Sequence, residues 1–309
     1  MSIQSIRKYR ATREMNAGIK LPGTPIPSQM WRGYEGNSIA GDTWGNPTSQ
    51  LVMLLHGGGQ TRHAWKGTGE MLGAHGYYAV AIDARGHGDS DWSSDGIYSQ
   101  EIMALDLLSV LKQLDCSTPV LVGASMGGIT SLLVSGESQN PEVLTNFLPK
   151  GLVMVDIAPK TEAKGVTRIG EFMTHKPEGF DSLEEVAEWI SVYQPHRKKK
   201  SDLKGLSKNL RLSENGKYCW HWDPRFMTMR KDIQNREERL NKCAKELSVP
   251  TLLVRGGLSD ILSEEGAREF LQQCEHAKYV NITDAAHMVA GDRNDIFGQS
   301  VLKFLSELN

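Results

Sequence analysis

The chain has 309 residues, of which 39% are hydrophobic and 23% are charged, and its formal net charge is −2. A chain of this length buries a sizeable core, as one large domain or as one domain with an insertion. The near-neutral charge argues against general nucleic-acid binding, and no stretch approaches the roughly 18 apolar residues of a membrane-spanning helix.

The cysteines indicate a reducing compartment. Cys116, Cys219, Cys243 and Cys274 are widely spaced and form no C-x-x-C pair. That pattern is typical of free cytosolic thiols, not of a disulfide framework or a zinc site. The first ten residues also lack the apolar segment of a secretory signal. We therefore expect a cytoplasmic protein without a metal; the oligomeric state is left open.

In chain order, residues 1–28 are basic and then rich in Pro and Gly, which predicts an N-terminal arm outside the core. A strand hairpin is predicted between Met30 and Trp44. Short apolar runs then alternate with amphipathic stretches. Strands are expected at 51–55, 77–82, 119–123, 151–156, 250–255 and 279–282, and helices at 99–114, 263–273 and 295–308. This alternation indicates a mostly parallel sheet with helices on both faces.

The alternation breaks over residues 160–241, which are more polar and partly helical. We interpret this segment as an insertion into a core made of residues 29–159 and 242–309. The basic run H-R-K-K-K at 196–200 could attract an anionic substrate, although a solvated loop explains it as well.

The sequence L-V-G-A-S-M-G-G places Ser125 between Gly123 and Gly127, directly after an apolar strand. A tight strand-to-helix turn would present this serine at the carboxyl edge of the sheet, where open α/β sheets bind ligands. The motif is short, and an incidental serine in a glycine-rich turn is the alternative.

A nucleophilic serine needs a base, and the base needs an acid to orient it. His287 follows the last expected strand, and Asp260 lies in the loop after the strand at 250–255. Both fall at the same edge as Ser125, in the chain order Ser, Asp, His expected for this topology. Asp156, which ends the strand at 151–156, is the rival for the acid.

Two backbone N–H groups are expected to stabilise the oxyanion that forms during acyl transfer. Met126 follows the nucleophile and supplies one of them. The turn H-G-G-G-Q supplies the other, with Gly58 as the first choice and Gly59 as the second. His56 is interpreted as structural.

Together, H-G-G-G-Q, D-A-R-G-H-G-D-S-D (83–91), G-A-S-M-G-G, G-G-L-S-D and D-A-A-H resemble the α/β-hydrolase superfamily. The resemblance implies an α/β-hydrolase fold with a mainly helical cap at 160–241, close to the smaller capped esterase-like and haloperoxidase-like enzymes. It implies structural roles for Arg85, His87 and Asp89. Epoxide hydrolases and haloalkane dehalogenases of this fold carry an aspartate nucleophile, so Ser125 argues against both.

We therefore expect a serine hydrolase that cleaves a small-molecule ester, thioester or lactone through an acyl-enzyme and requires no cofactor. An acyltransferase with the same triad, or a ligand-binding protein of the same fold, is the alternative. Trp189, Trp220 and Trp222 are candidates for the roof of an apolar substrate pocket, together with Tyr193, Phe226 and Met227. The alternative is that these residues simply pack the cap onto the core.

Overall fold

The protein is described by a computed structural model that covers residues 18–137, 147–196, 203–229 and 233–308. Its centre is an eight-stranded sheet in the order β11-β10-β7-β6-β4-β5-β3-β2. The strands are β2 (Gln29–Arg32), β3 (Ser38–Trp44), β4 (Leu51–Leu55), β5 (Tyr78–Ile82), β6 (Val120–Ala124), β7 (Gly151–Val155), β10 (Thr251–Gly256) and β11 (Lys278–Ile282). From β11 to β5 all neighbours pair in parallel, whereas β2 and β3 form an antiparallel hairpin at the edge. The predicted α/β sheet is confirmed.

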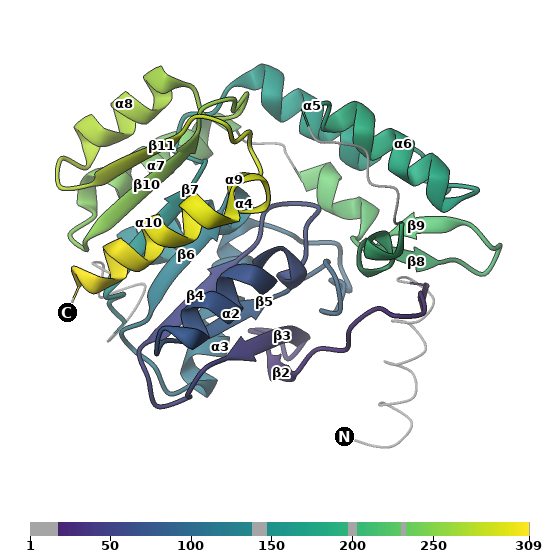
Figure 1. Cartoon of the computed structure of the whole chain (residues 1–309), viewed down its shortest axis with the longest axis horizontal. Helices are drawn as coiled ribbons and strands as arrows, with labels where there is room; N and C mark the ends of the chain where they lie inside the picture. The colour runs from purple at the N-terminus through teal and green to yellow at the C-terminus, as the bar shows by residue number, and fades with distance from the viewer. Residues whose placement is uncertain (1–17, 138–146, 197–202, 230–232, 309) are drawn as a thin grey trace.

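Helices cover both faces of this sheet (Figure 1). One face carries α3 (Gln100–Gln113), α4 (Met126–Glu137), α7 (Ile233–Glu246) and α8 (Glu264–Gln273). The other carries α2 (Lys66–Ala74), α10 (Asn294–Ser306), the short α9 (Val289–Asp292) and the 3₁₀ turn η1 (Arg62–Trp65). Three helices begin with serine caps: Ser99, Ser182 and Ser263 each accept a backbone N–H of the first turn.

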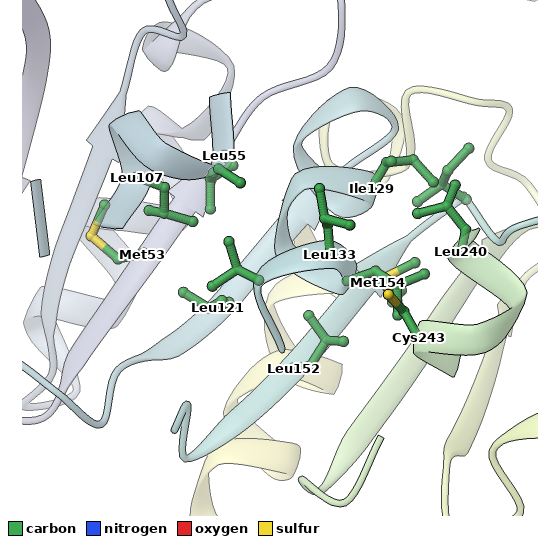
Figure 2. Packing of buried hydrophobic residues seen from close by; sticks show 14 of the residues in the cluster. Met53, Leu55, Leu107, Leu121, Ile129, Leu133, Leu152, Met154, Leu240 and Cys243 are labelled. Atoms are coloured by element: carbon green, nitrogen blue, oxygen red, sulfur yellow. The ribbon is translucent and has the colours of Figure 1, made fainter. Parts of the chain in front are cut away.

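The core is built from strands that are buried on both faces. In β4, Met53 and Leu55 belong to the cluster under α3 and α4, whereas Val52 and Leu54 belong to the cluster under α2 and α10. This alternation follows from the two-residue period of a strand. Figure 2 shows the first cluster, in which sheet residues meet Leu133 of α4 and Cys243 of α7.

A second, smaller unit lies outside the sheet (Figure 1). It contains α5 (Ala163–Thr174), α6 (Leu183–Tyr193), the 3₁₀ turns η2 (Lys204–Asn209) and η3 (Pro224–Met229), and a three-stranded sheet of β1 (Ile19–Lys20), β8 (Leu210–Leu212) and β9 (Tyr218–Trp220). Phe180, Val186 and Leu210 form its own buried cluster. We call the part within 160–229 the cap.

The predicted segment boundaries need two adjustments. The arm at 1–28 is not wholly separate, because β1 pairs antiparallel with β8 and extends the sheet of the cap. Helix α7 starts inside the predicted insertion, yet Leu240 belongs to the main core. The chain thus returns to the core within α7, before residue 242. Residues 197–200 of the basic run lie outside the described residues.

No helix among the described residues is long and apolar enough to cross a membrane.

Candidate active site

Ser125 occupies a strained turn between β6 and α4. Its φ is +48°, in the left-handed region that non-glycine residues seldom adopt. The flanking glycines are required by contact: a Cβ on Gly123 would lie 2.3 Å from the Gly127 carbonyl oxygen, and one on Gly127 would lie 2.4 Å from the Leu55 carbonyl oxygen. Both contacts are with backbone atoms, so glycine is required at both positions. The turn leaves Ser125 half-buried at the carboxyl end of β6.

His287 meets a carboxylate from a neighbouring strand end. Its Nδ1 lies 2.7 Å from Oδ2 of Asp156, which follows β7 and is fully buried. The same carboxylate accepts the Gly256 N–H at 2.7 Å and the Ser259 hydroxyl at 2.5 Å. These two donors hold the carboxylate in place as an acceptor beside the His287 ring. Nδ1–H of His287 therefore points to Asp156, and Nε2 is left for a reacting proton.

The preference for Asp260 as the partner of His287 is wrong. Asp260 is about one third exposed, and its Oδ2 forms an ion pair with Arg168 Nε of α5 at 2.9 Å. Both aspartates come to the same edge of the sheet, because β7 and β10 are parallel neighbours and each is followed by a loop that carries one of them. Within G-G-L-S-D, the residue that turns toward the site is Ser259, whereas Asp260 faces the cap.

The serine and the histidine lie at one edge without a direct bond. The Ser125 N–H donates to the Val155 carbonyl at 3.2 Å, which places the serine beside the strand that ends in Asp156. Within the described residues, no hydrogen bond joins the Ser125 hydroxyl to the His287 ring. Catalytic hydrogen bonds are often long without substrate and tighten in the complex.

The turn after β4 offers one available N–H. The Gly57 N–H donates to Gln60 Oε1 at 3.0 Å, Gly59 N–H to His87 Nε2 at 3.1 Å, and Gln60 N–H to the Gly57 carbonyl at 3.1 Å. Gly58 N–H has no acceptor among the described residues. A Cβ on Gly57 would lie 3.3 Å from the Ser125 Cβ, so the turn adjoins the serine.

The three tryptophans occupy different positions. Trp222 is buried and approaches the turn, because a Cβ on Gly59 would lie 3.5 Å from its ring. Trp220 stacks on Trp222, with centroids 4.8 Å apart and planes at 11°. Trp189 stacks instead on His175, with centroids 3.6 Å apart.

Two cap residues directly cover the turn: Phe226, which the sequence offers for the pocket roof, and Met173, which it does not. A Cβ on Gly58 would lie 3.6 Å from Phe226 and 3.9 Å from Met173. Both come from the cap, in η3 and α5. No local motif marks Met173, since its position depends on how the cap folds over the sheet.

Three buried histidines line the base of the turn: His56, His87 and His221. Burial lowers the pKa of His56 to about 4 and that of His87 to about 3, and it lowers the pKa of His221 well below 6.5. All three are therefore neutral at pH 7. His56 Nδ1 contacts the Gly57 carbonyl at 2.8 Å and its Nε2 accepts the Ala84 N–H at 2.9 Å, which is a structural role.

Arg85 and Asp89 also have structural contacts. Arg85 donates from Nε to Asp106 at 2.6 Å, and both side chains are buried. Burial opposes ionisation of Asp89, but its pKa is lowered by Lys20, Arg211 and Arg62. These contacts agree with the structural interpretation of the loop at 83–91.

Comparisons with known proteins identify the family of the chain. The family model described as serine aminopeptidase, S33, matches residues 46–294. The esterase Rv0045c of Mycobacterium tuberculosis is 28% identical over 270 residues, which cover 84% of this chain and 83% of that protein. The sn-1-specific diacylglycerol lipase ABHD11 of mouse is 27% identical over 278 residues, which cover 85% and 83%.

Solved structures share the fold. A structure of the M. tuberculosis esterase Rv0045c superposes with a TM-score of 0.68 at 27% identity, covering 96% of this chain and 97% of that one. E-2-(acetamidomethylene)succinate hydrolase superposes with a TM-score of 0.77 at 17% identity, covering 91% and 100%. The family match spans most of the chain and includes the serine turn and the histidine–aspartate pair. The chain therefore belongs to the S33 serine aminopeptidase-like family of α/β hydrolases.

Proposed function

We propose that this protein is a serine esterase that cleaves a small carboxylic ester through an acyl-enzyme. The observation that carries the proposal is the 2.7 Å contact between His287 and Asp156, at the sheet edge that also holds Ser125 in its strained turn. The relatives named as an esterase and a lipase support ester chemistry.

In the proposed reaction, Ser125 Oγ attacks the ester carbonyl while His287 Nε2 takes the hydroxyl proton. Asp156 holds the Nδ1–H tautomer and stabilises the imidazolium that forms. The carbonyl oxygen becomes an oxyanion held by the N–H groups of Met126 and Gly58. Collapse breaks the bond to the alcohol, which leaves with the proton from His287. Water then attacks the acyl-enzyme while His287 takes its proton. The bond to Ser125 Oγ breaks, the carboxylic acid is released, and His287 returns the proton to Oγ.

The cap would contribute an apolar cover to this site. Met173, Trp222 and Phe226 lie over the glycine turn and exclude water from the side that faces the oxyanion. Thioesters and lactones present the same carbonyl and belong to the same proposed substrate class. The four cysteines are free, which supports the proposal of a cytoplasmic location.

The test is covalent labelling by a fluorophosphonate probe, read by mass spectrometry, together with p-nitrophenyl acetate hydrolysis. We expect the wild-type protein to be labelled at Ser125, and Ser125→Ala to lose both labelling and hydrolysis. Full hydrolysis by Ser125→Ala would contradict the proposal. Saturable substrate binding by an unlabelled wild-type protein would instead indicate a binding protein of the same fold.

A further inference from the structure

The glycine turn is held at both backbone polar groups of Gly59. Its N–H donates to His87 Nε2 at 3.1 Å, and its carbonyl lies 3.4 Å from His221 Nε2. Gly59 has a φ of +73°, a conformation that glycine adopts without strain. The residue next to the proposed oxyanion donor Gly58 is therefore fixed by two imidazoles.

The two imidazoles are in defined tautomers. His87 Nδ1 lies 3.1 Å from the Arg85 carbonyl, which can only accept, so Nδ1 carries the proton and Nε2 is the acceptor for Gly59. His221 Nδ1 accepts the Gly88 N–H at 2.8 Å, so its proton is on Nε2 and faces the Gly59 carbonyl. Both rings are fully buried, with centroids 5.9 Å apart.

His221 belongs to the cap, whereas His87 belongs to the loop that follows β5. The cap is hydrogen-bonded to that loop at both backbone groups of Gly88. His221 accepts the Gly88 N–H, and Arg211 of β8 donates to the Gly88 carbonyl at 2.7 Å. Asp223 adds a third contact through its N–H to the Gly86 carbonyl at 2.9 Å. The cap is thus hydrogen-bonded to Gly88, and His87, the residue before Gly88 in the chain, is hydrogen-bonded to Gly59.

We propose that His87 and His221 are positioning residues for the oxyanion turn, so that the seated cap sets the geometry of Gly58 as well as covering it. The inference rests on the proposed esterase function and deepens it. The cap then acts on the rate of the chemical step and not only on substrate binding.

The test uses paired amide substitutions of His87. In His87→Gln the side-chain oxygen reaches the position of Nε2 and still accepts the Gly59 N–H. In His87→Asn the amide reaches only the position of Nδ1, so the contact with Gly59 is lost and the contact with Arg85 is kept. Because the oxyanion contact acts in the transition state, we expect His87→Asn to lower kcat for p-nitrophenyl acetate about tenfold or more with little change in KM.

A second pair and a transition-state probe complete the design. His221→Gln retains the donor to Gly59 and His221→Asn does not, so we expect the Asn variant to be the slower one. The inhibition constant of phenylboronic acid, which forms a tetrahedral adduct at the serine, should rise in both Asn variants. His75→Asn, on the exposed end of α2, is the control and should leave all values unchanged.

Equal kcat for the Asn and Gln variants at each position, or rate losses that follow the loss in Tm alone, would overturn the positioning role. Ser125→Ala is measured in parallel. If it is inactive while all histidine variants retain wild-type kcat, the esterase proposal stands and the positioning inference fails. If Ser125→Ala remains active, the esterase proposal itself fails.

Discussion

At the scale of single residues, the site depends on two non-glycine residues in the left-handed region. Ser125 has φ of +48° and Asp156 has φ of +51°, and each directly follows a parallel strand. Such conformations cost about 1–3 kcal/mol and persist only where the surroundings determine them. Here the close backbone packing of Gly123 and Gly127 determines the turn at Ser125.

This packing predicts a contrast between two glycines. Gly127→Ala places a Cβ 2.4 Å from the Leu55 carbonyl oxygen, whereas Gly58→Ala meets nothing closer than 3.6 Å. Overpacking of this kind costs about 1–3 kcal/mol, so we expect Gly127→Ala to lower the urea midpoint clearly. Gly58→Ala should unfold like the wild type, and equal midpoints for the two variants would contradict the account.

Single residues also show what the sequence could not predict. Ser125 and His287 stand out because a local motif and a strand end mark each of them. Asp156 and Asp260 follow adjacent strands of one sheet, and both satisfy the chain order. They differ only in the direction of the side chain, which depends on contacts between distant residues. The ion pair of Asp260 with Arg168 is such a contact, because Arg168 belongs to the cap and lies 92 positions away in the chain.

At the scale of elements, the cap is tied to the core by buried charge. Arg211 of β8 donates to Asp89 at 3.0 Å, and Asp89 also contacts Arg62 at 3.1 Å and Lys20 of β1 at 2.8 Å. Asp89 is buried, so each cation offsets part of its desolvation. These contacts link β1, β8 and η1. They could not be predicted, because the charged residues involved are far apart in the sequence and no motif marks them as partners.

We expect Arg211→Met to destabilise the protein by about 3 kcal/mol, because it leaves a buried carboxylate with fewer partners and removes the donor to Gly88. Lys217→Met is the matched control. Lys217 pairs with the largely exposed Asp181, and exposed pairs contribute about 0–1 kcal/mol. Chemical denaturation of both variants measures the difference, and similar losses would refute the role of the buried pair.

At the scale of the whole molecule, the fold could be predicted in outline because its strands are apolar runs and its helices are amphipathic stretches between them. Each of these signals is local, and together they identify the α/β architecture. The cap sheet escaped prediction because β1, β8 and β9 are two or three residues long and because Ile19 of β1 pairs with Leu212 of β8, which is far away in the chain. Strands that short carry no periodic pattern.

The buried histidines make the stability of the molecule depend on pH. Burial lowers the pKa of His56 and His63 to about 4 and that of His87 to about 3, against 6.5 in the unfolded chain. Between pH 6.5 and these values the unfolded chain binds more protons, so the free energy of unfolding falls as pH falls. Each such histidine contributes a slope of about 1.4 kcal/mol per pH unit.

Urea unfolding at intervals from pH 7.5 to 4.5 measures this dependence. We expect the free energy of unfolding to decrease below about pH 6.5 and His56→Gln to reduce the slope, since it removes one of the groups that gain a proton on unfolding. A stability that stays constant down to pH 4.5 would show that these histidines titrate alike in both states.

The assignment of Asp156 to His287 is tested most directly by kcat/KM for p-nitrophenyl acetate in Asp156→Asn and Asp260→Asn. The Asp156→Asn substitution favours the wrong tautomer of His287, so we predict that it lowers kcat/KM roughly 10³–10⁴-fold. Asp260→Asn breaks only a half-exposed ion pair with Arg168, so its activity should stay within about threefold of the wild type. The opposite order, with Asp260→Asn inactive and Asp156→Asn active, would contradict the site described.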